Sequence, residues 1–267
     1  MASIESEPGA EAAPAEDAGH VAAGESPGPS GRFAARPVRL GALALAAGVT
    51  AGLVAWLGGE AAHGTFAPPA GLYGALEKSA ILAREQLAAQ VKNAALAFGL
   101  LGAATGLALG VVGGLARRST RASAGAGLVG LVGLVAGLAA GAATSLILVP
   151  IGERDPGLAE SLFVPLLMHG GIWSAVGAAG GLAFGLGLGG RGMAPRALLG
   201  GLSGALLGTI GYELVGALVF PLAGTSHALS ATAPTRLLAC LYVTIPVALC
   251  AGRAVLAPPA RASSASR

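Results

Sequence analysis

The sequence predicts an all-α integral membrane protein with six transmembrane helices. Between Arg39 and Arg253 lie six long stretches that carry almost no charge. A helix of about 20 apolar residues crosses a bilayer core about 30 Å thick. Only 11% of the residues are charged and 54% are hydrophobic, whereas roughly a quarter are charged in a soluble domain. Basic residues do not cluster with aromatic ones, so the lipid bilayer is an expected partner and nucleic acid is not.

Apolar stretches and polar tails define the predicted organisation. We expect spans at residues 40–59, 93–115, 124–150, 163–189, 197–222 and 237–256. Residues 1–36 and 257–267 contain few large hydrophobic side chains, which predicts disordered tails. The first tail could bind a protein partner, and the sequence does not predict an oligomeric state.

The longest connection between spans covers residues 60–92. Its second half, residues 71–92, has apolar residues at nearly helical spacing, which predicts an interfacial helix that leads into the second span. Pro246, in the middle of the last span, predicts a kink there.

The distribution of arginine predicts the orientation, because cytoplasmic segments of membrane proteins are enriched in Lys and Arg. With a cytoplasmic N-terminus, eleven basic residues lie inside and five lie outside. We therefore expect both termini in the cytoplasm and residues 60–92 outside. The inside set is Arg32, Arg36, Arg39, Arg117, Arg118, Arg121, Arg191, Arg196, Arg253, Arg261 and Arg267, and the outside set is Lys78, Arg84, Lys92, Arg154 and Arg236.

Glycine recurs at every fourth residue in several spans. Residues four apart share one helix face, and without side chains there two helices approach closely. The pattern therefore predicts a glycine zipper of helix contacts, with a pore or flexible gate lined by backbone as the alternative. The predicted packing glycines are Gly102, Gly106, Gly110, Gly114, Gly177, Gly181, Gly185, Gly189, Gly204 and Gly208.

An internal repeat accompanies the glycine pattern. The segment GAATGLALG at residues 102–110 returns as GAAGGLAFG at residues 177–185, identical at seven of nine positions. Downstream, Gly133 and Gly137 match Gly204 and Gly208 with an offset of 71. The hairpin of spans two and three is thus expected to recur as spans four and five. Both copies enter the membrane from the same side, which makes this a parallel repeat and not an inverted one.

One carboxylate, Glu213, lies inside a predicted span. Such a side chain costs about 2.5–3.5 kcal/mol near the bilayer centre and needs protein or water around it. His169 lies at a similar depth on the preceding span, so we expect a direct or water-bridged contact between the two. Tyr212 and Arg236 are candidate further members of this polar site. The pair either fixes the helix register or binds protons or a small cation, and the sequence leaves both interpretations open.

The sequence lacks the usual patterns of catalytic and metal sites. It contains no HExxH, GxSxG or CxxC motif, and its four histidines are far apart. We therefore expect no enzymatic activity, no metal and no cofactor. The favoured interpretation is a non-enzymatic structural or accessory membrane protein. The alternative is a channel or transporter for protons or a small cation that uses Glu213 and His169.

Residues 177–221 resemble the proteolipid subunits of rotary ATPase rings. They contain a glycine-repeat helix, a basic loop with Arg191, Pro195 and Arg196, and a second helix that carries Glu213. The resemblance implies that Glu213 is a proton-carrying residue. It covers 45 residues, and the first and sixth spans have no counterpart in such a ring.

Overall fold

The computed structural model describes residues 30–73, 78–155, 157 and 161–257. It is 85% helical, with no strand among these residues. Six of its helical segments are long and apolar enough to cross a membrane. The all-α, multi-pass membrane fold predicted from the sequence therefore agrees with the structure.

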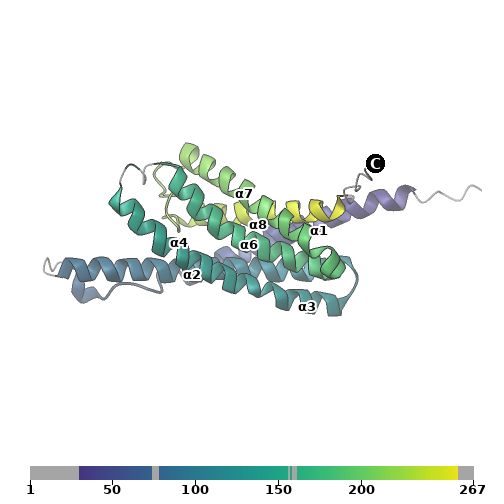
Figure 1. The fold of residues 1–267 in the computed structure, drawn as a ribbon, viewed down its shortest axis with the longest axis horizontal. Helices are drawn as coiled ribbons and strands as arrows, with labels where there is room; N and C mark the ends of the chain where they lie inside the picture. The colour runs from purple at the N-terminus through teal and green to yellow at the C-terminus, as the bar shows by residue number, and fades with distance from the viewer. Residues whose placement is uncertain (1–29, 74–77, 156, 158–160, 258–267) are drawn as a thin grey trace, which may run out of the picture.

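The helices lie roughly along one axis and form an elongated bundle (Figure 1). The third candidate span consists of two helices, α3 and α4, which meet at Leu131. The elements are α1 (Ser30–Ala61), η1 (Ala70–Leu72), α2 (Ser79–Ala116), α3 (Thr120–Gly130), α4 (Val132–Arg154), α6 (Phe163–Gly189), η3 (Gly190–Gly192), α7 (Ala194–Val219) and α8 (Ala233–Leu256).

Helix α1 begins earlier than the sequence predicted. We expected a disordered tail through residue 36, but residues 30–36 form the first turns of this helix. The stretch between Gly31 and Pro37 is rich in Ala and Arg, which favour helix. Residues 1–29 and 258–267 of the two expected tails lie outside the described residues.

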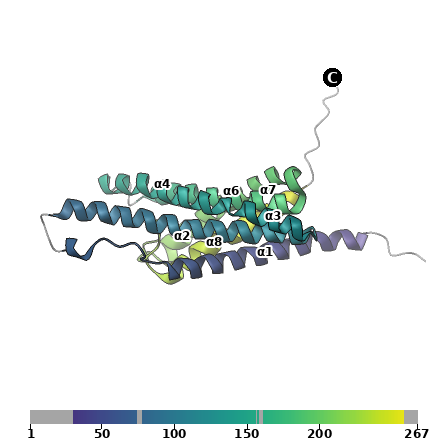
Figure 2. The same ribbon diagram turned by 90° about the horizontal axis from the view of Figure 1, so that it is seen from below.

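The helix that we expected over residues 71–92 begins at Ser79 and belongs to α2, and residues 74–77 of that range lie outside the described residues. Residues Ser79–Ala116 form one continuous helix of 38 residues, which is about 57 Å long. No glycine or proline occurs between Ser79 and Phe98, so nothing breaks the helix before the span. Its first half therefore continues the axis of the span and extends beyond the neighbouring helices (Figures 1 and 2).

Helix α6 is the centre of the bundle. Of its apolar stretch, 61% is buried, more than in any other candidate span. It packs against α2, α3, α4, α7 and α8. Ile172, Trp173, Val176 and Phe184 on this helix are fully buried. A polar side chain on α6 is therefore surrounded by protein, which positions the site described below.

Glycines bring the backbones of α2 and of the α3–α4 segment into contact. A side chain on Gly102 would collide with the carbonyl oxygen of Gly133, and one on Gly106 would collide with that of Gly130. The interface therefore requires residues without a side chain at these positions.

The α6–α7 hairpin packs in the same manner. A side chain on Gly177 would lie 2.5 Å from the carbonyl oxygen of Gly201, and one on Gly181 would collide with the carbonyl of Ala197. The other predicted glycines of α2 and α6 face Ala126 (Gly110), Ser123 (Gly114), Ala194 (Gly185) and Met193 (Gly189).

The second helices of the two hairpins do not make equivalent contacts. Gly133 packs inside its own hairpin against α2, but its sequence counterpart Gly204 faces the carbonyl of Pro246 on α8. Gly208 faces the carbonyl of Tyr242, which lacks its usual helical donor because Pro246 has no N–H. The hairpins thus share close packing but not partners, and the duplication remains a prediction from the sequence.

Candidate functional site

His169 on α6 and Glu213 on α7 form a hydrogen-bonded pair inside the bundle. Nδ1 of His169 contacts Oε1 of Glu213, so of the direct or water-bridged contact that we expected the structure has the direct one. The two residues are only 1% and 3% exposed, so neither faces lipid. A carboxylate without a partner would be costly at this depth, and the imidazole supplies that partner.

Aromatic side chains hold the imidazole in place. The ring of Trp173, one turn further along α6, lies 5.1 Å from that of His169, and the ring of Tyr212 meets it edge-on at 5.5 Å. Trp173 and Tyr212 also contact each other, at 5.2 Å. The predicted site residue Tyr212 therefore adjoins the pair and orients it by packing.

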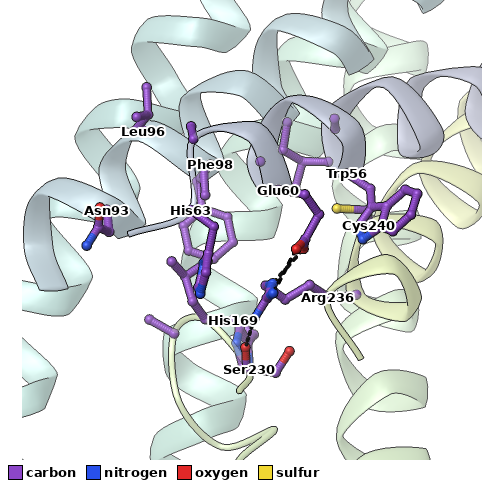
Figure 3. Close-up of a pocket in the computed structure, with 18 of the residues that line it drawn as sticks. Trp56, Glu60, His63, Asn93, Leu96, Phe98, His169, Ser230, Arg236 and Cys240 are labelled. Atoms are coloured by element: carbon purple, nitrogen blue, oxygen red, sulfur yellow. Dashed lines mark hydrogen bonds and ion pairs between the residues drawn. The ribbon is translucent and has the colours of Figure 1, made fainter. Parts of the chain in front are cut away.

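Arg236 does not join the pair, although the sequence offered it as a member. Its guanidinium instead forms a bidentate ion pair with Glu60 on α1, with distances of 2.6 Å from Nε to Oε1 and 2.8 Å from Nη2 to Oε2 (Figure 3). The reason is that the first turn of α8 lies beside the last turn of α1, which presents Glu60. Nη1 donates to the carbonyl oxygens of Ser230 and Ala231, each at 2.9 Å. Arg236 thus fastens α8 to α1 and to the connection at residues 220–232.

A cavity adjoins the pair, and we call it the inner cavity. Its wall includes His169, Glu60 and Arg236 (Figure 3). Trp173 and Tyr212 also line it. Its water-accessible volume is about 60 Å³. Since one water molecule needs roughly 10–15 Å³ of such volume, a few water molecules fit. Of the two members of the pair, His169 lines the cavity, while Glu213 lies behind it.

A larger cavity, which we call the vestibule, adjoins the inner cavity. Its volume is about 610 Å³, within the range of about 300–1,000 Å³ that is common for small-molecule sites. His63 and His227 line it and are exposed at the surface, so the vestibule opens at the end of the bundle where α1 ends. The residues that line both cavities are His63, Asn93, Ala228 and Leu229.

Asn93 on α2 fixes the chain that follows α1. Its amide nitrogen donates to the carbonyl oxygen of Phe66 at 2.9 Å, and its amide oxygen accepts from the backbone N–H of Phe66 at 3.2 Å. The segment after α1 is therefore held against α2, beside the place where the two cavities meet.

Sequence reasoning missed Glu60, Trp56 and Asn93 as parts of this region. Glu60 was placed in a connection because it follows the predicted end of the first span. A signal was present, since Glu60 and Arg236 both lie at span boundaries on the same predicted side of the membrane. Opposite charges at one depth favour pairing.

Searches against known protein families, curated proteins and solved structures found no match for this chain.

Proposed function

We propose that this chain is a non-enzymatic, multi-pass membrane protein that takes up protons at His169 and Glu213, and that it transports protons or a small cation. The observation that carries the proposal is the contact between the inner cavity and His169. A pair that only fixes helix register gains nothing from a cavity beside it. A proton-binding pair needs one, because protons arrive through water.

The order of the groups supports proton uptake. The inner cavity meets His169, and His169 meets the carboxylate of Glu213. Histidine changes charge near neutral pH, and intramembrane chains of His and acidic residues serve as proton relays in transporters. A proton from the vestibule would therefore reach the imidazole first and the carboxylate second.

Beyond the pair, the path toward the other end of the bundle is tightly packed. A side chain on Gly113 of α2 would lie 2.5 Å from the carbonyl oxygen of Phe184 on α6, and one on Gly187 would lie 2.6 Å from that of Gly110. Transport across the membrane therefore requires α2 and α6 to separate. The same close packing favours a second candidate function, a structural or accessory role in which the His169–Glu213 pair is connected to only one side of the membrane.

We also propose that both termini are cytoplasmic and that the two hairpins arose by duplication. The excess of arginine at the end of the bundle opposite the vestibule supports a cytoplasmic location for both termini, so the vestibule faces outward. The glycine repeats support an origin of the two hairpins by duplication. The resemblance to ATPase proteolipids gains no support, since α7 packs against α8 through Gly204 and Gly208.

The experiment is a proton-flux assay in reconstituted vesicles that contain a pH-sensitive dye. We expect the native protein to dissipate an imposed pH gradient faster than protein-free vesicles do. Glu213→Gln combined with His169→Gln should remove that excess flux while leaving the yield of folded protein unchanged. Glu85→Gln, at an exposed position on α2, is the matched control and should conduct normally.

Two results would contradict the transport proposal. The first is equal dissipation by native and protein-free vesicles under both signs of membrane potential. The second is a Glu213→Gln, His169→Gln protein that loses folded yield but conducts as well per molecule as the native one. The second result would establish the structural role.

A further inference from the structure

Trp173 carries a polar group that the proposed proton site does not use. Its indole Nε1 is buried and has no hydrogen-bond partner among the described residues, and the side chain lines the inner cavity. An indole N–H can only donate, and a buried donor without an acceptor costs free energy. The other tryptophan of the chain, Trp56, lines the same cavity, but its Nε1 donates to the carbonyl oxygen of Ala233 at 3.2 Å.

The vestibule repeats this feature. The hydroxyl of Ser145 on α4 is 1% exposed and also has no partner among the described residues, and Ser145 lines the vestibule. The two cavities share lining residues, so they form one elongated space beside both groups.

The charges on the wall of the inner cavity oppose each other. Glu60 and Arg236 are bound to one another through two hydrogen bonds, and His169 is bound to Glu213. A charged ligand would have to break the Glu60–Arg236 or the His169–Glu213 pair to use these charges. The other histidine of the wall, His63, is exposed at the surface. Leu96, Phe98 and Leu101 supply apolar wall, which favours an uncharged molecule.

We propose that the inner cavity and the vestibule together bind a small, uncharged organic molecule whose acceptor oxygen takes the indole N–H of Trp173. The ligand class is a ketone, alcohol or similar compound with an apolar body. The vestibule volume of about 610 Å³ accommodates that body, and the narrower inner cavity accommodates the oxygen.

Fluorescence quenching tests this site, because both tryptophans of the chain line the inner cavity. The protein in phosphatidylcholine nanodiscs is titrated with para-bromoacetophenone, whose bromine quenches tryptophan on contact. The control ligand is para-bromoethylbenzene, which has a similar shape but no acceptor. Trp173→Phe keeps an aromatic ring and leaves Trp56 as reporter, and Trp56→Phe is the matched control.

We expect saturable quenching by the ketone. Trp173→Phe should weaken its binding about five- to tenfold, the value of one hydrogen bond. Trp56→Phe should change it less than twofold, because that N–H already has a partner in the protein. The affinity for para-bromoethylbenzene should be the same in both variants.

Three results would overturn the site. One is quenching that never saturates, which means partition into lipid alone. Another is an equal loss of affinity for both ligands in Trp173→Phe, which would mean that the substitution changed the shape of the cavity and did not remove a hydrogen bond. The third, which holds even if Trp173→Phe fails to fold, is native protein that binds the ketone no better than para-bromoethylbenzene after correction for partition into empty nanodiscs. No proton flux is measured, so this test is independent of the proposed function.

Discussion

Substituting alanine for Gly110 tests whether the glycine faces carry the stability of the bundle. A Cβ at this position would lie 2.5 Å from the carbonyl oxygen of Ala126 on α3. Gly125, on the same α3 helix, is the matched control, because a Cβ there would meet nothing within 4 Å. Both residues are helical, so the two substitutions share the intrinsic effect of alanine and differ in the contact alone.

The magnitude follows from the contact distance. Close C···O contacts between helices measure about 3.3–3.6 Å, so α2 and α3 would have to separate by about 0.8–1.1 Å. A gap of this size loses about a quarter to a half of each dispersion contact across the interface, and overpacking of this kind costs about 1–3 kcal/mol. Gly125→Ala should instead stabilise by up to about 1 kcal/mol through helix propensity. Gly110→Ala gains the same propensity term, so the two variants should differ by the cost of the contact alone, about 1–3 kcal/mol.

The assay is reversible unfolding in mixed micelles, followed by circular dichroism as the denaturing detergent fraction rises. Gly110→Ala should unfold at a lower fraction than native protein, and Gly125→Ala at the same or a higher one. Equal shifts for both variants would refute the reasoning, since the contact with Ala126 would then carry no energy.

Two further predictions follow from the ends of the bundle. Glu60→Gln and Arg236→Gln should each lower the free energy of unfolding by about 1.5–3 kcal/mol in the same micelle assay. The double variant should lose less than the sum of the two, because both substitutions remove the same interaction. Strict additivity would mean that the ion pair does not contribute to stability. In a background without native cysteines, Ala67→Cys and Ser226→Cys should react with a membrane-impermeant maleimide added to whole cells and Ser119→Cys should not; external labelling of Ser119→Cys would reverse the proposed orientation.

The fold class could be predicted from the sequence because a membrane imposes a simple rule. A helix satisfies its own backbone hydrogen bonds in lipid, so long uncharged stretches become helices whatever their neighbours are. The pairing of His169 with Glu213 could be predicted in the same way. Each is a polar group that is costly to bury in the membrane, and the two lie at similar depth in adjacent spans. Glycine every fourth residue likewise indicated close contacts, and Gly102 and Gly177 do meet backbone atoms of a neighbouring helix.

Which helix meets which face was decided by the tertiary structure. The repeat aligns Gly204 with Gly133, yet Gly204 packs on α8 while Gly133 packs inside its hairpin. The sequence allowed Arg236 to contact Glu213. In the structure it pairs with Glu60 because α1 lies beside α8. The inner cavity, with the unpaired indole of Trp173, arises where five helices converge, and the vestibule arises where three do. Periodicity and hydropathy are properties of one helix at a time, whereas partners and cavities depend on how several helices fit around α6, and that fit is a property of the whole bundle.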